Sequence, residues 1–151
     1  MKEFKNINDI LDFAITQEQE SVDFYNNIAS KSSGEAMRKV FEQFAQEEMG
    51  HKAKLLDIKE KGIFDISSEK VVDLKIADYI VDAKPSPKMT YQDALVLAMK
   101  KEKSAFKLYL NLSERAPGTE LKNLFLMLAQ EESKHKLRFE LEYDEYVLRE
   151  N

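Results

Sequence analysis

The sequence predicts an all-α fold, a bundle of four long helices arranged as two helical hairpins that one long crossover joins. Three observations support this fold class. The 151 residues include only four Gly and three Pro, so long helices can run without interruption. Apolar residues recur at helical spacing over four long stretches. The second half of the chain also repeats the pattern of the first, which predicts two similar hairpins.

The repeat is clearest in two stretches, 44–51 and 128–135, which read FAQEEMGH and LAQEESKH. Each stretch places a glutamate three residues before a histidine, and the chain has two histidines in all. Residues i and i+3 of a helix lie on the same face, so each carboxylate and its imidazole are expected to point at one spot. The same offset of 84 residues pairs further residues without a gap: Ala14 with Ala98, Glu18 with Glu102, Tyr25 with Tyr109, Gly34 with Gly118, and Phe41 with Phe125.

The first two helices follow directly from the apolar pattern. The first is expected over about residues 7–29, with Asn6 as its N-cap. A turn follows, in which Ser32 and Glu35 form a capping-box pattern for the second helix. That helix is expected to continue until Gly62 stops it.

The helical period breaks over residues 62–89. An extended piece is expected near residues 71–74 and a short helical turn within residues 76–81. Thr90 then caps the third helix, and the fourth is expected over about residues 120–148 after a second short turn.

Connection lengths predict the topology. Short loops join antiparallel neighbours in helix bundles. A helix of about 25 residues is roughly 40 Å long, and about 28 extended residues reach roughly twice that distance. The middle segment can therefore run the length of the bundle and make helices two and three parallel, which is the ferritin-like arrangement. We expect residues 1–151 to form a single ferritin-like domain.

Composition excludes several classes of function. The net charge of −5 argues against nucleic-acid binding, which needs a basic surface. No apolar run is long enough to span a bilayer, and no signal-peptide pattern follows Met1. The absence of Cys excludes disulfides, thiolate metal sites and a built-in iron–sulfur or rubredoxin-type centre within these residues. We expect a cytoplasmic protein.

Six polar residues occupy positions that the helical period assigns to the core: Glu18, Glu48, His51, Glu102, Glu132 and His135. Burying an unpaired carboxylate costs several kcal/mol, and no Lys or Arg shares these positions. Two divalent cations would offset four carboxylates, and the two imidazoles complete a ligand set that suits iron or manganese. One Glu from each of two helices and Glu-x-x-His from each of the other two is the known ligand pattern of di-iron and di-manganese bundles. The sequence therefore predicts two metal ions held by these six residues.

Other polar residues near the core are less decisive. Tyr25 and Tyr109 follow Glu18 and Glu102 by two helical turns, so they are core aromatics or donors of hydrogen bonds to the carboxylates. Glu47 and Glu131 lie about 100° around the helix from their neighbours and are expected to be mostly solvated. Glu142 falls near the core side of the fourth helix, but its mate in the repeat is Ile58, and we assign it no role.

These residues resemble a known family. The patterns AIxxE ending at Glu18 with FY at 24–25, and FAQEExxH at 44–51, look like the ferritin-like di-iron domain of rubrerythrins, and the second half matches in kind. The resemblance extends over about residues 7–146. It implies that the four Glu and two His hold two iron ions, with Glu48 and Glu132 as bridging ligands. It also implies reduction of hydrogen peroxide with electrons from an external donor.

Two departures from that family matter. Rubrerythrins carry a rubredoxin domain with Cys-ligated iron, and this sequence has no Cys. They usually carry an extra ligating Glu three residues after the third-helix ligand, a position that is Ala105 here. Electrons must then come from another protein, such as a rubredoxin.

Three functions follow as hypotheses. The first is a di-iron oxidoreductase that reduces peroxide or dioxygen, with manganese or zinc as alternative metals. The second is a ferroxidase or iron-storage protein resembling bacterioferritin, in which a Met directly after the second-helix Glu binds haem. Met49 occupies that position here, although a Met on a helix is more often a packing residue. The third is a bundle that only sequesters iron. For all three we expect a homodimer that binds neither nucleic acid nor membrane.

Overall fold

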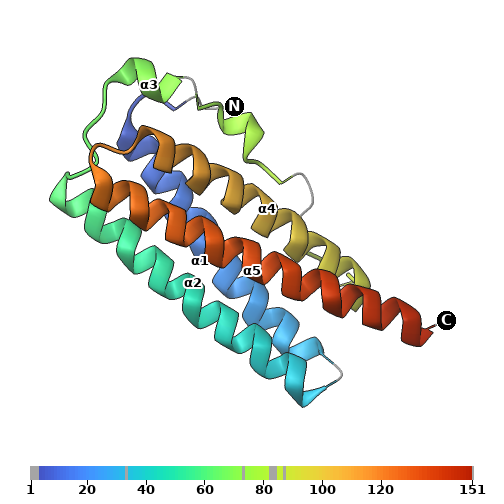
Figure 1. Cartoon of the computed structure of the whole chain (residues 1–151). Coiled ribbons are helices and arrows are strands. Elements are labelled where there is room, and N and C mark those ends of the chain that lie inside the picture. The colour runs from blue at the N-terminus through green and yellow to red at the C-terminus, as the bar shows by residue number, and fades with distance from the viewer. Residues whose placement is uncertain (1–3, 33, 73, 82–84, 87, 151) are drawn as a thin grey trace.

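Four long helices make up most of the molecule (Figure 1). The computed structural model describes residues 4–32, 34–72, 74–81, 85–86 and 88–150. The long helices are α1 (Ile7–Lys31), α2 (Glu35–Lys61), α4 (Tyr91–Arg115) and α5 (Thr119–Glu150). Within the described ranges the remaining regular elements are also helical: α3 (Ser68–Val72) and the 3-10 helix η1 (Ile76–Asp78). The predicted all-α class is confirmed.

The helices form two hairpins, α1 with α2 and α4 with α5, each closed by a short turn. The connection between α2 and α4 runs along the outside of the bundle, so α2 and α4 point the same way (Figure 1). Two hairpins with one long crossover are the ferritin-like topology, which is also confirmed. The described part of the chain includes no helix that is long and apolar enough to cross a membrane.

Helix ends follow local chemistry with one exception. Asn6 Oδ1 accepts from the backbone N–H of Asp9 at 3.0 Å, and Thr90 Oγ1 accepts from that of Asp93 at 3.0 Å. Gly62 ends α2 with φ of 61°, a left-handed conformation that glycine adopts without strain. The capping box at Ser32 was a wrong prediction.

Gly34 occupies the N-cap position of α2 instead, with no side-chain cap. The Ser32 hydroxyl turns back and donates to the carbonyl of Ala29 at 3.0 Å, at the end of α1. A serine between two helices can serve either of them, and here it serves the helix that precedes it.

The crossover packs on the bundle through one apolar face. Val71 and Leu74 are buried, together with Phe64 and Tyr79. The extended conformation predicted for residues 71–74 is wrong, because α3 covers Ser68–Val72 and the backbone N–H of Leu74 donates to the carbonyl of Val71. A helical turn brings residues i and i+3 to one side, so Val71 and Leu74 can both face the core. The short helical turn predicted next is confirmed by η1.

Two apolar clusters fill the bundle, and a polar layer lies between them. One cluster gathers Leu11, Leu55, Leu112 and Phe125 with the crossover residues, and the other gathers Phe41, Leu95 and Phe139 at the opposite end. The polar layer consists of the six glutamates and histidines that the sequence placed in the core.

Candidate metal centre

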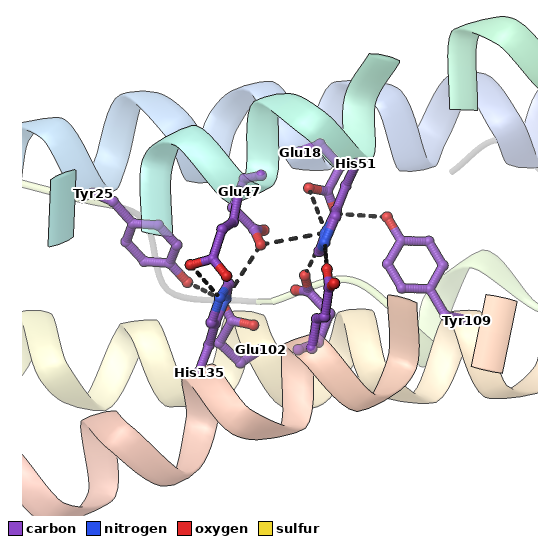
Figure 2. A network of polar contacts seen from close by, with 10 residues as sticks. Glu18, Tyr25, Glu47, His51, Glu102, Tyr109 and His135 are labelled. Atoms are coloured by element: carbon purple, nitrogen blue, oxygen red, sulfur yellow. Dashed lines mark hydrogen bonds and ion pairs between the residues drawn. The ribbon is translucent and has the colours of Figure 1, made fainter. Parts of the chain in front are cut away.

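All six predicted ligands are buried and each comes from one of the four long helices. Glu18 lies on α1, Glu48 and His51 on α2, Glu102 on α4, and Glu132 and His135 on α5. None is more than 2% exposed. Figure 2 shows Tyr25 at one end of the layer and Tyr109 at the other, with His135 nearer Tyr25 and His51 nearer Tyr109.

The ligand atoms fall into two groups that share two carboxylates. One group is Glu18, Glu48, His51 and Glu132, and the other is Glu48, Glu102, Glu132 and His135. Within each group the candidate ligand atoms lie within 4.8 Å of one another. Glu48 and Glu132 belong to both groups, as expected for carboxylates that bridge two ions.

Each histidine turns Nδ1 toward the carboxylates. His51 Nδ1 lies 2.9 Å from Glu132 Oε1 and 3.5 Å from both Glu18 Oε2 and Glu48 Oε1. His135 Nδ1 lies 3.3 Å from Glu48 Oε1 and 3.5 Å from Glu102 Oε1. The duplicated Glu-x-x-His spacing therefore places the two histidines in equivalent positions, each beside its own set of carboxylates.

The residues present fit a pair of metal ions. Buried polar atoms normally have hydrogen-bond partners. Among the described residues, one oxygen of each of the four glutamates and Nδ1 of both histidines have none, and these atoms point into the polar layer. Oxygen ligands with two imidazoles suit iron or manganese, and zinc also accepts such ligands. This buried cluster has the composition and the unpartnered ligand atoms of a metal-binding site.

Without metal the carboxyls compete for protons. Burial, and then the charge of Glu48, raises the pKa of Glu18 to about 8. Burial and neighbouring carboxylates also raise the pKa of Glu102 and, further still, that of Glu132. Burial alone would raise the pKa of Glu48 as well, but hydrogen bonds from His135 and Glu132 and the charges of both histidines lower it overall. One carboxylate is thus kept ionised while its neighbours tend to hold protons.

The histidines hold protons for the converse reason. Burial alone would lower the pKa of His51, but hydrogen bonds and charge from Glu18, with further carboxylates, raise it to about 9. Burial is likewise outweighed at His135, where Glu102 and Glu48 raise the pKa to about 10. Metal ions that bind here must therefore displace protons.

Two tyrosines donate to the outer carboxylates, as one of the two interpretations of the sequence predicted. Tyr109 Oη donates to Glu18 Oε1 at 2.6 Å, and Tyr25 Oη donates to Glu102 Oε1 (Figure 2). Both phenols are fully buried, and burial next to glutamates raises their pKa well above 10. Each hydroxyl thus stays protonated and fixes the orientation of one carboxylate.

Glu47 and Glu131 are not simply solvated, and that prediction was wrong. Glu131 contacts Nε2 of His51. Glu47 Oε2 lies 3.5 Å from Nε2 of His135 (Figure 2). Their side chains are 33% and 37% exposed. A position 100° from the ligand lies at the edge of the helix where α2 faces α5, so a long side chain reaches the neighbouring helix. The Glu-Glu doublet present in both repeats was the signal that could have revealed them.

Three further residues lie outside the two groups. Glu142 is buried on α5 but receives a hydrogen bond from Tyr91 at 2.8 Å, well beyond His135 along the helix. Ala105 packs at the edge of an apolar cluster. Met49 is 47% exposed on α2.

A small cavity lies beside the centre between α1 and α4. Its volume is about 20 Å³, and Glu18, Ala105 and Tyr109 are among the residues that line it. That volume is enough for a water-sized molecule.

Comparisons with known proteins agree with this picture. The family model described as Rubrerythrin matches residues 9–89 and 93–151. A solved structure of a hypothetical protein from Pyrococcus furiosus is similar, with 27% sequence identity and a TM-score of 0.70 over 89% of this chain and 86% of that chain. No curated protein matches.

Proposed function

The chain belongs to the rubrerythrin family, and from this premise we propose that it is a di-iron oxidoreductase that reduces hydrogen peroxide, or dioxygen, with electrons from an external donor such as a rubredoxin. The observation that supports this most is the pair of buried four-residue groups that share Glu48 and Glu132.

Six side chains would hold the metals in this function. His51 and Glu18 would bind one ion and His135 and Glu102 the other, while Glu48 and Glu132 lie within reach of both. When bound, two iron ions would supply two electrons, which together with two protons convert hydrogen peroxide into two water molecules. The protein contributes by fixing the ligands, excluding bulk water and holding protons close to the reacting oxygens.

Tyr25 and Tyr109 keep the two outer carboxylates in place. Each donates to one oxygen of Glu102 or Glu18, and the other oxygen, which has no hydrogen-bond partner, would hold a metal ion. A carboxylate anchored through one oxygen can still change how its other oxygen binds as the charge of the site changes. The tyrosines are therefore positioning residues in this proposal.

The cavity between α1 and α4 favours a small oxidant. Its volume of about 20 Å³ suits a molecule the size of water or peroxide, and Glu18 lies on its wall. Larger organic substrates would need the helices to move apart.

The electron donor must be a separate molecule or segment, because the 151 residues carry no Cys for a rubredoxin-type centre. We also propose that the protein works as a homodimer, which light scattering of the purified protein tests directly.

The alternative is a ferroxidase or storage protein resembling bacterioferritin. The partly exposed carboxylates Glu47 and Glu131, next to the buried histidines, favour it, since they offer oxygen ligands to iron on its way to the site. Met49, 47% exposed, could reach a haem only at an interface with another copy.

Stopped-flow spectroscopy of the anaerobic diferrous protein separates these functions. We expect it to react faster with peroxide than with dioxygen and to turn over only with an added redox partner. Growth of a mineral core of many irons per chain would support storage instead. Diferrous protein that ignores both oxidants would leave only sequestration. Glu102→Ala, which removes a ligand, serves as the inactive control.

A further inference from the structure

A row of five aromatic rings leads from the metal centre toward the end of the bundle where α4 begins: Tyr25, Phe139, Phe41, Tyr91 and Tyr146. Successive ring centroids are 5.4, 5.7, 6.1 and 5.2 Å apart, the spacing of rings in direct contact. The first three rings are fully buried, and Tyr91 and Tyr146 are half-buried. The row therefore connects Tyr25, which donates a hydrogen bond to the ligand Glu102, to the protein surface.

The two tyrosines on either side of Phe139 and Phe41 in the row have carboxylate partners. Tyr25 donates to Glu102, and Tyr91 donates to Glu142 Oε2 at 2.8 Å. A phenol that loses one electron becomes a strong acid, so it is oxidised readily only where a nearby base takes its proton. Glu142 is such a base, 5% exposed and outside both metal groups. Tyrosine is also the most readily oxidised type of side chain here after Cys and Trp, both of which the chain lacks.

The ligands recur at the offset of 84 residues, but most residues of the aromatic row do not. At the offset of 84 residues, the mates of Phe139, Tyr91 and Glu142 are Leu55, Ile7 and Ile58. On that side Tyr109 contacts Phe125 and Phe125 contacts Phe64, which is buried, and no tyrosine continues the row among the ring contacts of the described residues. Aliphatic residues thus suffice for packing at these positions, so packing alone does not require the aromatic row.

We propose that this row carries a one-electron oxidising equivalent away from the metal centre to the surface, with Glu142 taking the phenolic proton of Tyr91. The inference rests on the proposed function, because peroxide that receives one electron instead of two gives hydroxide and a hydroxyl radical. The row removes that radical before it damages the core.

The steps balance as follows. Tyr25 gives an electron and its phenolic proton to the hydroxyl radical, which becomes water. Tyr91 then gives an electron to the Tyr25 radical through Phe139 and Phe41, and Tyr25 takes a proton back from that water, which leaves hydroxide. The proton of Tyr91 passes to Glu142. When the hole moves on to Tyr146, the proton on Glu142 returns to Tyr91 and the phenolic proton of the half-buried Tyr146 passes to solvent. An external one-electron reductant then restores Tyr146, which takes a proton back from solvent.

Freeze-quench electron paramagnetic resonance of the iron-loaded protein, mixed with excess peroxide, tests the proposal. We expect a tyrosyl radical in the wild-type protein, identified by its narrowed signal when the protein contains ring-deuterated tyrosine. Tyr91→Phe should lose most of this signal while peroxide is still consumed at the wild-type rate. Glu142→Gln should also lose it, although every ring of the row is retained. Tyr143→Phe, which removes a tyrosine of α5 outside the row, should keep it.

Mass spectrometry of the same samples gives a second readout. Oxidation products should lie at Tyr146 in the wild-type protein and shift to the buried residues Tyr25 and Phe139 in Tyr91→Phe. An unchanged radical in Tyr91→Phe, a radical on Tyr109, or no radical while peroxide is consumed would overturn the proposal and leave the proposed function standing. Failure to consume peroxide at all would overturn both.

Discussion

The histidines each serve two sets of partners through two different nitrogens. Nδ1 faces the carboxylates of the centre, and Nε2 faces Glu131 or Glu47 on the opposing helix. When Glu131 accepts a hydrogen bond from Nε2 of a neutral His51 ring, the lone pair of Nδ1 is left for a metal. Glu131 therefore determines which nitrogen of His51 is available in the buried site, and Glu47 lies 3.5 Å from the corresponding nitrogen of His135.

Replacing Glu131 should weaken metal binding without touching a ligand. Glu131→Ala removes the acceptor for Nε2 of His51, and we expect metal affinity to fall by about 10–100-fold. Competition with a chelator of known affinity at fixed pH measures this change. Glu60→Ala, at an exposed position near the end of α2, is the matched control. Equal affinities for the two variants would show that the contact has no role in binding.

Ligands and positioning residues should separate by metal content. Glu102→Ala removes an oxygen ligand and should lose one metal per chain together with turnover. Tyr109→Phe removes one hydrogen bond to Glu18 and should keep both metals while turnover slows by about 10–100-fold. Elemental analysis and peroxide assays of the same preparations check both results. Loss of metal in Tyr109→Phe would mean that the phenol is needed to assemble the site.

The site was predictable to the extent that helical periodicity determines it. Glu18 and His135 occupy buried positions with a simple spacing, so their inward direction followed from the sequence. The contacts of Glu47 and Glu131 depend on how closely α2 packs against α5, and the hydrogen bond between Tyr91 and Glu142 joins two different helices. Such distances depend on tertiary packing, which the pattern of one helix does not contain.

Helix ends show which local signals outweigh others. Asn6 and Thr90 cap α1 and α4 as predicted, because each is the residue directly before the first helical turn. Ser32 lies in a short connection where two helix ends compete for one hydroxyl, and the capping-box pattern alone did not indicate which end would bind it. The crossover misled for a related reason: residues 71–74 were expected to be extended, but burial of Val71 and Leu74 against the bundle favoured a helical turn.

The cap at Thr90 should contribute measurably to stability. Thr90→Ala leaves the backbone N–H of Asp93 without its acceptor and should cost about 0.5–2 kcal/mol. For a chain of this size that corresponds to a fall in Tm of about 2–4 °C per kcal/mol. Thermal unfolding followed by circular dichroism measures it, with Ser133→Ala on the exposed face of α5 as the control. An unchanged Tm would show that solvent replaces the cap without loss.

The molecule as a whole holds a buried polar layer between two apolar clusters, and this layout makes its stability depend on what fills the centre. Without metal, the folded state must keep several protons on the ligands. Metal ions replace those protons and remove the repulsion between carboxylates. Stability and metal binding are therefore two readouts of the same electrostatics.

The metal-free protein should lose stability as pH rises through the neutral range. Its pKa values are raised on folding, from 4.5 to about 8 for Glu18 and from 6.5 to about 9 and 10 for His51 and His135. The folded state therefore binds more protons than the unfolded state across this window, and the free energy of unfolding falls as pH rises. The lowered pKa of Glu48 acts in the opposite sense, below its ordinary value of 4.5.

Thermal melting of the metal-free and metal-loaded forms between about pH 6 and about pH 9 tests this prediction. The metal-free form should show a falling Tm, and the loaded form a flatter profile because metal has replaced the protons. Parallel profiles for the two forms, with metal loss verified, would mean that the polar layer is hydrated and the carboxylates do not repel one another.

The central claim is that six buried side chains hold two metal ions that share Glu48 and Glu132. Anomalous diffraction at the iron absorption edge, from crystals of the iron-loaded protein, tests it most directly. The account predicts two anomalous peaks per chain, one beside Nδ1 of His51 and one beside Nδ1 of His135, with both shared carboxylates reaching both peaks. A single peak, peaks elsewhere on the molecule, or none in crystals that contain stoichiometric iron would contradict it.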